Sequence, residues 1–358
     1  LYPNNSKLFN IMGVILAKND YKLKAIEAFK KAIKFDSKNP HPYNNLGITF
    51  IDINEFEKAE KILHKTILLF PEFIEAYCNL VNLYKTNKEY PKAVKIFKKC
   101  IIHNPNNLET YKNLFWTLKK INAFKELDQL INQAFNRIKY LSKKDAIIWE
   151  KWVAMCLHEM AEIYENNHRL TEAKKKYYRA IKIKKDYTPS LNNLSKLLFK
   201  EGDKEKALKY LKISRKIQPN NITILKNIAI ICMQKKNYYL AIKYLNKALT
   251  RDKTSYDLLT NLSMCYINLF NDKKANQNFK IIGNYLIDTK KFSTNNLFYL
   301  KQILFLITYL NHLSDKEIFK FYKLFGKYHD NIKEMSWKLT PPIKKPKKKL
   351  RIGYVSPD

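Results

Sequence analysis

The chain has 358 residues, of which 46% are hydrophobic and 13% aromatic, so it can form a packed interior and is not a disordered polymer. Its 67 Lys and Arg residues against 32 Asp and Glu give a formal net charge of +35. Such a charge suits nucleic acid, an anionic membrane surface or acidic partners. Only six of the basic residues are Arg, the side chain best suited to phosphate and base recognition. We therefore interpret the charge as a solvated Lys surface and not as a specific nucleic-acid site.

The cysteines and the apolar runs exclude further classes. No segment reaches the roughly 18 apolar residues of a membrane span. The cysteines form no Cys-x-x-Cys pair and their number is odd, so they predict neither a disulfide framework nor a zinc site. We expect reduced core residues of a cytoplasmic protein at Cys78, Cys100, Cys156, Cys232 and Cys265.

Self-similarity dominates the sequence from its N-terminus onward. The stretch YNNLGITFIDINEFEKAEKILHKTILLFP at 43–71 aligns with YCNLVNLYKTNKEYPKAVKIFKKCIIHNP at 77–105, which lies 34 residues later. The same spacing gives eight units, which begin at Ser6, Pro40, Ile74, Leu108, Ala154, Thr188, Ile222 and Tyr256. The opening LYPNN places Pro3 where Pro71 and Pro105 stand in their units, so we interpret it as the tail of a further repeat upstream.

Each unit predicts two helices. Apolar residues at unit positions 4, 7, 8 and 11 form one stripe of a first helix, and those at positions 20, 24 and 27 form one stripe of a second. Position 20, where the two helices should approach most closely, is Ala in seven units and Leu127 in the other. Pro71, Pro105 and Pro219, at position 32, should end second helices.

This pattern resembles the tetratricopeptide repeat family over residues 1–287. The resemblance implies an all-α fold, in which helix pairs stack into a right-handed superhelical solenoid whose concave groove is lined by the first helices. One departure stands out, because Leu108 and Ala154 are 154 − 108 = 46 residues apart, 12 more than the period. The segment FNRIKYLSKKDAIIWEKW at 135–152 has apolar residues at helical spacing, so we expect lengthened helices there and an atypical insertion near 135–153.

Position 6 of the first helix, which the resemblance places in the groove, is Asn in six of the eight units: Asn45, Asn79, Asn113, Asn193, Asn227 and Asn261. A carboxamide offers a donor and an acceptor side by side, so this column could bind the backbone of an extended peptide weakly, without reading its side chains. The alternative is that these side chains bond within their own or the next unit. The NLS sequons at 193–195 and 261–263 are discounted, because Ser195 and Ser263 fall at the packed position 8.

The array offers no catalytic constellation. Its His residues are scattered without an i, i+4 pair, and the six Gly of the chain form no phosphate-binding loop. We interpret each His as a surface or loop residue. No catalytic, cofactor-binding or metal-binding residue is therefore assigned.

The last seventy residues leave the period. Residues 288–337 predict a helical connector, whose second helix begins at the capping box Ser314-x-x-Glu317. Residues 338–349, KLTPPIKKPKKK, predict a basic Pro-containing linker. The final run, LRIGYVSPD at 350–358, has the branched and aromatic content of a buried strand followed by a turn.

In this order, the array, the helical pair, the linker and LRIGYVSPD resemble the SPINDLY and O-linked N-acetylglucosamine transferase family. In that family the last run is the first strand of a Rossmann-like (GT-B) catalytic region. The resemblance implies transfer of N-acetylglucosamine from UDP-N-acetylglucosamine to Ser or Thr of cytosolic proteins, without a metal. The catalytic and donor-site residues would lie beyond Asp358, so none is carried over, and we expect this chain to be an inactive acceptor-recognition arm.

The partners expected from this interpretation are extended peptide segments of acceptor proteins. Self-association through the repeats is a further option, whereas a specific nucleic acid and a membrane are not expected. The competing interpretation is a non-enzymatic tetratricopeptide scaffold for protein–protein interaction. The donor sugar, N-acetylglucosamine or fucose, stays open because the chain contains no donor-site residue.

Overall fold

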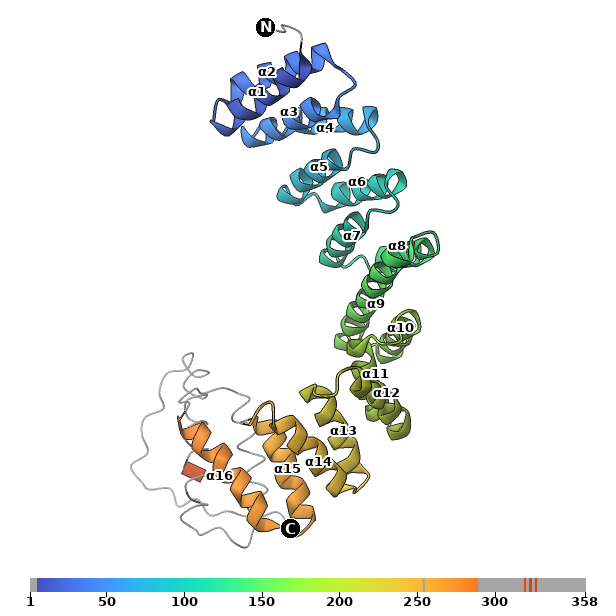
Figure 1. Ribbon diagram of the computed structural model, residues 1–358, viewed down its shortest axis with the longest axis vertical. Coiled ribbons are helices and arrows are strands. Elements are labelled where there is room, and N and C mark those ends of the chain that lie inside the picture. The colour runs from blue at the N-terminus through green and yellow to red at the C-terminus, as the bar shows by residue number, and fades with distance from the viewer. Residues whose placement is uncertain (1–4, 254, 289–318, 320–321, 324–325, 327–358) are drawn as a thin grey trace, which may run out of the picture. The chain divides into compact units, whose positions relative to one another are not determined.

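The computed structural model describes residues 5–253 and 255–288, together with residues 319, 322, 323 and 326 (Figure 1). The chain divides into two compact units, Leu1–Tyr187 and Thr188–Asp358, which are described separately below. Outside the described residues lie the opening LYPN, the helical connector beyond residue 288 apart from the four residues just named, its capping box, the linker at 338–349 and the strand at 350–358.

The described part of the chain is all-helical, with sixteen helices and no strand. The first unit contains α1 (Ser6–Lys18), α2 (Lys22–Phe35), α3 (Pro40–Asp52), α4 (Phe56–Leu69), α5 (Ile74–Thr86), α6 (Tyr90–His103), α7 (Leu108–Lys120), α8 (Phe124–Ile138), α9 (Lys143–Asn166) and α10 (Leu170–Ile183). The second unit contains α11 (Thr188–Lys200), α12 (Lys204–Ile217), α13 (Ile222–Gln234), α14 (Tyr238–Leu249), α15 (Tyr256–Asn268) and α16 (Asp272–Asp288).

Consecutive helices pair into hairpins, and in each unit every hairpin packs against the next (Figure 1). Seven of the eight first helices begin at the residue where the 34-residue period starts a unit, and the exception is α9. The second helices α4, α6 and α12 end two residues before Pro71, Pro105 and Pro219, as predicted. The helix-pair solenoid expected from the sequence is therefore confirmed for the described residues.

The interior of each hairpin is built on small side chains. The Ala residues at position 20 are fully buried, and their small side chains let the two helices approach closely. Leu127, which takes this position in the remaining unit, is fully buried as well. In the first two hairpins, a glycine at position 8 of the first helix leaves room for a large side chain of the second helix. A Cβ atom added at Gly13 would lie 2.5 Å from the Phe29 ring, and one added at Gly47 would lie 2.7 Å from Leu63. Ser195 and Ser263 are also buried at position 8, as expected.

A backbone motif closes every hairpin. Position 15 has positive φ in all eight repeats, from Asp20 at 65° to Phe270 at 55°, with Gly202 at 90°. The N–H of position 16 then donates to the carbonyl of position 11, as in the 2.9 Å bond from Tyr21 to Leu16 and the 2.7 Å bond from Glu89 to Tyr84. This is the Schellman arrangement, which satisfies a carbonyl at the helix end that would otherwise lack a partner.

The predicted lengthening is confirmed in one helix. Helix α9 begins eleven residues before Ala154 and has 24 residues in all, whereas α8 has 15. Its additional turns bury Trp149 and Trp152, whose rings pack edge-on against Tyr111 of α7 at centroid distances of 4.9 and 6.2 Å. The extra apolar residues of the insertion thus extend the core between α7 and α9.

Two expectations from the sequence need correction. All five cysteines are free thiols and four are buried, but Cys78, at position 5 and outside the apolar stripe of positions 4, 7, 8 and 11, is exposed. His158 was expected at the surface but is buried in α9, where it packs against Tyr177 and Tyr187. Across the described residues, no helix combines the length and the apolar character needed to cross a bilayer.

Candidate peptide-binding face

The predicted Asn column lies on one side of the first helices, at position 6. All six side chains are half-buried, neither sealed in the core nor fully exposed. Position 5 precedes each of them on the same helix. Within each unit separately, we call the side chains at positions 5 and 6 of the first helices, with those one turn away, the first-helix face of that unit.

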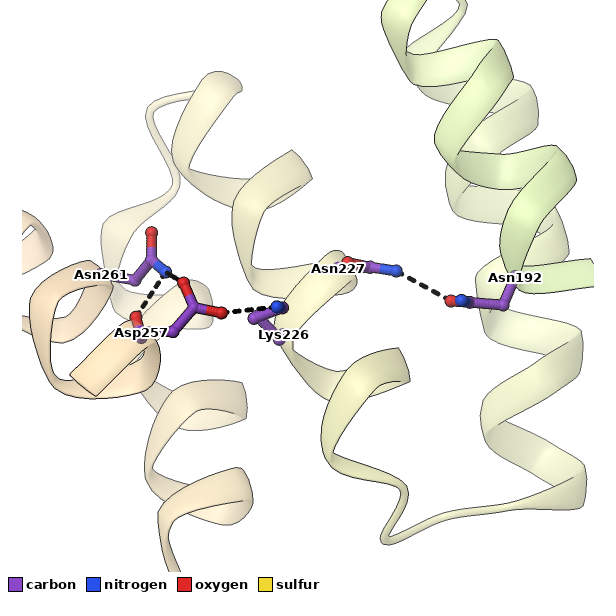
Figure 2. Close-up of polar contacts among 5 residues, drawn as sticks. All are labelled: Asn192, Lys226, Asn227, Asp257 and Asn261. Atoms are coloured by element: carbon purple, nitrogen blue, oxygen red, sulfur yellow. Dashed lines mark hydrogen bonds and ion pairs between the residues drawn. The ribbon is translucent and has the colours of Figure 1, made fainter. Parts of the chain in front are cut away.

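Three of the six Asn bond to the preceding repeat. In each case the Nδ2 of the Asn at position 6 donates to the Oδ1 of an Asn at position 5 of the previous first helix. We call these pairs amide rungs: Asn45 to Asn10 at 3.0 Å, Asn79 to Asn44 at 2.8 Å, and Asn227 to Asn192 at 2.8 Å, the last drawn in Figure 2. The first two lie in the first unit and the third in the second unit.

An amide rung leaves hydrogen-bonding capacity on both of its members. The bond between Asn79 and Asn44 uses one N–H of Asn79 and one lone pair of the Asn44 oxygen. It does not use the Oδ1 of Asn79 or the Nδ2 group of Asn44. Each rung therefore fixes two carboxamides in orientation and leaves an acceptor and a donor unused; in this rung the acceptor is on the half-buried Asn79, and the donor is on Asn44, which is 7% exposed.

A charged pair replaces the amide rung between α13 and α15 (Figure 2). Position 5 is Lys226, whose Nζ lies 2.5 Å from Oδ2 of Asp257. The Nδ2 of Asn261, at position 6, turns back to its own helix, where it donates to the backbone oxygen of Asp257 at 2.6 Å and to its Oδ1 at 3.2 Å. We call this pair and the next one charged rungs.

The second charged rung joins α7 to the long helix α9. Glu159 stands at position 6 in place of Asn, and its Oε2 lies 2.6 Å from Nζ of Lys119. The Glu159 side chain is only 17% exposed, so its carboxylate depends on this partner. The same ammonium lies 4.7 Å from the ring centroid of Trp116, which is partly exposed on α7.

Asn113 and Asn193 complete the column. The residue at position 5 before Asn113 is Cys78, whose sulfur is a weak acceptor. Although Cys78 is exposed, neighbouring groups partly desolvate its thiol, and this, with help from Glu75 and Glu109, raises the pKa of Cys78, so the thiol stays protonated. Within the described part of the chain, no side chain bonds the carboxamide of Asn113. Asn193, in contrast, is engaged by a polar contact.

Position 5 of the long-helix repeat is His158. Its Nε2 lies 3.3 Å from Oε1 of Glu162, one turn along α9. Burial lowers the pKa of His158, and this effect outweighs the opposing pull of Glu162, Glu159 and Glu165. The imidazole is therefore kept neutral at neutral pH. Among the described residues, no group of three acidic, His or Cys side chains could hold a metal ion.

The structure brings together residues that the sequence reasoning missed. The Asn column was identified, but its partners at position 5 were not, although Asn10, Asn44 and Asn192 each stand 35 residues before a column member. That spacing, one residue more than the period, is the signal that pairs them. The alternative that the column residues bond within their own or the next unit is confirmed at Asn261, which bonds to Asp257 of its own helix, whereas three others bond to the preceding repeat. The column as a peptide-binding site stays a prediction.

Two family models match the chain. A tetratricopeptide repeat model matches residues 6–39 and 74–107, and a model of the coatomer epsilon subunit matches residues 163–298. Among solved structures, the MamA protein is 20% identical, over a match that covers 50% of this chain and 91% of MamA, with a TM-score of 0.34. No curated protein matches the chain.

The matched residues 6–39 coincide with the hairpin of α1 and α2, and residues 74–107 with the hairpin of α5 and α6. The other hairpins share their buried position 20 and their closing turn. The chain therefore carries tetratricopeptide repeats arranged as a solenoid, the architecture of a protein–protein interaction scaffold.

Proposed function

We propose that this chain binds an extended segment of a partner protein along the first-helix face, through hydrogen bonds to the backbone of that segment. The observation that carries the proposal is the amide rung. It holds two carboxamides in a fixed orientation and leaves one acceptor and one donor unused, as at Asn79 and Asn44.

The geometry suits an extended chain. Neighbouring packed helices lie about 8–10 Å apart, and an extended chain advances about 3.3 Å per residue, so one rung meets roughly every third residue. Each bond contributes only about 0.5–1.5 kcal/mol net, whereas ordering a peptide residue costs about 1–2 kcal/mol. Binding through rungs alone is therefore weak and tolerant of sequence, although fixed carboxamides lower the ordering cost.

Backbone methylation tests this proposal directly. The probe is a fluorescein-labelled 12-residue Ser/Thr/Asp peptide, compared with a copy in which alternate amide nitrogens are methylated. We expect the methylated copy to bind the chain at least about tenfold more weakly by fluorescence anisotropy, because it cannot donate to the free carboxamide oxygens.

Variants of the first rungs provide the matched comparison. Asn44→Ala and Asn79→Ala should each weaken binding of the unmethylated peptide. Asn136→Ala, which removes an exposed Asn on the second helix α8, should leave it unchanged. Equal binding of the two peptides would contradict the backbone-binding role.

We further propose a more specific role, as the acceptor-recognition arm of a protein O-glycosyltransferase that uses UDP-N-acetylglucosamine and no metal. Its support is the sequence LRIGYVSPD at 350–358, behind a tetratricopeptide array and a basic linker. Neither matched family model is that of a glycosyltransferase. The role predicts transfer of radiolabelled N-acetylglucosamine to Ser/Thr peptides by the complete gene product and none by residues 1–358. Transfer by the 358-residue chain alone would contradict it.

A second candidate role is that of a subunit in a larger assembly, which the match of residues 163–298 to the coatomer epsilon subunit favours. The two roles differ in the surface they use. If the chain is an assembly subunit, complexes purified through a tag on the chain should survive the Asn44→Ala and Asn79→Ala changes in native gels. If it holds extended segments through the rungs, the same variants should lose their bound proteins.

A further inference from the structure

The first-helix face changes character at α7. Position 5 of the preceding first helix is Cys78, which offers no amide oxygen to Asn113. Asn45 and Asn79 each use one N–H in an amide rung. Asn113 is half-buried, and among the described residues its carboxamide bonds no side chain. It therefore keeps a complete donor and acceptor pair, which can bond one peptide unit bidentately.

Trp116 lies one helical turn beyond Asn113, on the same side of α7. Its side chain is 47% exposed, although most of a Trp residue is usually buried. The ring packs edge-on against the buried Phe115, with centroids 5.6 Å apart and an interplanar angle of 82°. The ammonium of Lys119 lies 4.7 Å from the ring centroid and is itself bound to Glu159. The indole is thus held in place by neighbours while part of its surface stays uncovered.

Lysine side chains flank this pair along α7. Lys112 and Lys120 lie one turn before and one turn after Trp116. Lys112 pairs with Glu109 at 3.1 Å. The ammonium of Lys120 lies 5.0 Å from the ring centroid of Tyr90 and forms no ion pair with any described residue, so a segment that carries carboxylates is complementary to this part of the face.

We propose that Asn113 and Trp116 form the specificity-determining subsite of the first-helix face, and that it selects a proline or aromatic side chain flanked by acidic residues in an extended segment. The inference rests on the proposed peptide-binding role and names the side chain which that role leaves open. Asn113 bonds one peptide unit, and the ring of the ligand lies against the indole of Trp116. A ring side chain buries a large apolar area with few rotatable bonds, and Trp is among the residues that most often dominate binding energy.

A set of fluorescein-labelled decapeptides tests the subsite. They share a Gly/Ser background with two Asp residues and differ in the central residue, which is Pro, Tyr or Ala. A fourth peptide has Tyr at the centre and Asn in place of both Asp. With the whole 358-residue chain, anisotropy titrations should show the Pro and Tyr peptides binding about tenfold more tightly than the Ala peptide. The neutral peptide should bind less tightly than its acidic counterpart.

The variants separate the subsite from the rest of the face. Trp116→Ala should remove the preference for a ring, so that the Tyr and Ala peptides bind equally, whereas Asn113→Ala should weaken all peptides alike. Met264→Ala is the matched control, because Met264 occupies the position of Trp116 on α15 and is similarly exposed, at 42%. Circular dichroism melts should be unchanged for Trp116→Ala, since the side chain is half outside the core.

The outcomes distinguish the two levels of proposal. If the peptides bind but the central residue makes no difference, or if the ring preference survives Trp116→Ala, the subsite is wrong while the backbone-binding role stands. Equal binding of the acidic and neutral peptides would remove the charge preference. If no peptide binds the wild-type chain, both the subsite and the peptide-binding role fall.

Discussion

The two rungs of Figure 2 both start from position 5 of a first helix and differ in chemistry. Between α11 and α13, Asn227 donates to Asn192, and both partners are neutral. Between α13 and α15, Lys226 and Asp257 carry full charges, and Asn261 is drawn back to Asp257. The first arrangement leaves amide groups for a ligand, whereas the second satisfies its own polar groups.

This difference indicates that amide rungs and charged rungs have different roles in the first-helix face. Amide rungs join neighbouring repeats and can also bond an extended backbone. Charged rungs join repeats through an attraction that salt screens, and they leave less capacity for a backbone. Variants that remove one kind of rung at a time can therefore test whether the two kinds differ in stability and in salt dependence.

The largest effect should come from the charged rung at the long helix. Lys119→Met leaves the mostly buried Glu159 without its cation, and we expect a loss of about 2 kcal/mol in the free energy of unfolding, below the cost of a fully buried pair. Urea denaturation followed by circular dichroism measures it. The double variant Lys119→Met/Glu159→Gln should recover most of the loss, since it removes the unpaired charge. An unchanged urea midpoint for the single variant would show that this ion pair does not contribute to stability.

An intermediate effect is expected at the amide rung of Figure 2. Asn192→Ala and Asn227→Ala should each lower the free energy of unfolding by about 1 kcal/mol. The double variant should cost less than the sum of the two, by about 0.5–1 kcal/mol, because both single variants remove the same bond. Strict additivity in this double-mutant cycle would mean that the two carboxamides do not stabilise each other in solution.

A smaller effect should separate the two kinds of rung by salt. The coupling between Lys226 and Asp257, whose side chains are 28% and 36% exposed, should be a few tenths of a kcal/mol at low ionic strength. It should fall toward zero near 1 M salt, where the screening length is only about 3 Å. The coupling between Asn192 and Asn227 should not change. Equal salt dependence of the two cycles would contradict the assignment of one rung as ionic and the other as neutral.

The last prediction concerns how stability changes with pH because of His158, at position 5 of the long-helix repeat. Burial lowers the pKa of His158 in the folded chain, so below about pH 6.5 the unfolded chain binds the proton more readily. Stability should therefore fall as the pH falls from 7 through 6.5 toward the lowered pKa. His158→Gln should flatten this part of the profile. Identical slopes for the wild-type chain and His158→Gln in chemical denaturation from pH 5 to 7.5 would refute the role of His158.

Much of the fold follows from the 34-residue period. The starts of seven first helices and the small side chains at position 20 could be predicted, because both depend on apolar spacing within a single repeat. The closing turn could have been predicted too. Asp20, Asn54, Asn122 and Gly202 at position 15 are residue types that tolerate positive φ, but Lys88 and Phe270 in the same column obscured the signal.

The candidate site could be predicted only in part. The Asn column at position 6 is visible in the sequence, but the direction of each carboxamide depends on the residue at position 5 of the preceding repeat. Asn44 and Cys78 there lead to opposite outcomes for Asn79 and Asn113. Likewise, the burial of His158 follows from Tyr177 and Tyr187, which come from other segments, so a pattern within one helix could not reveal it.

The closing turn of each hairpin has a practical consequence. Because backbone atoms alone make it, the side chain at position 15 has no structural task, and in every repeat this residue is exposed. Evolution has placed there anything from Gly202 to Phe270. The chain thus presents a row of attachment points that touch neither the core nor the first-helix face. Fluorophores attached at positions 54 and 122 would report the distance between two hairpins of the first unit, and so any change in that distance when a ligand binds.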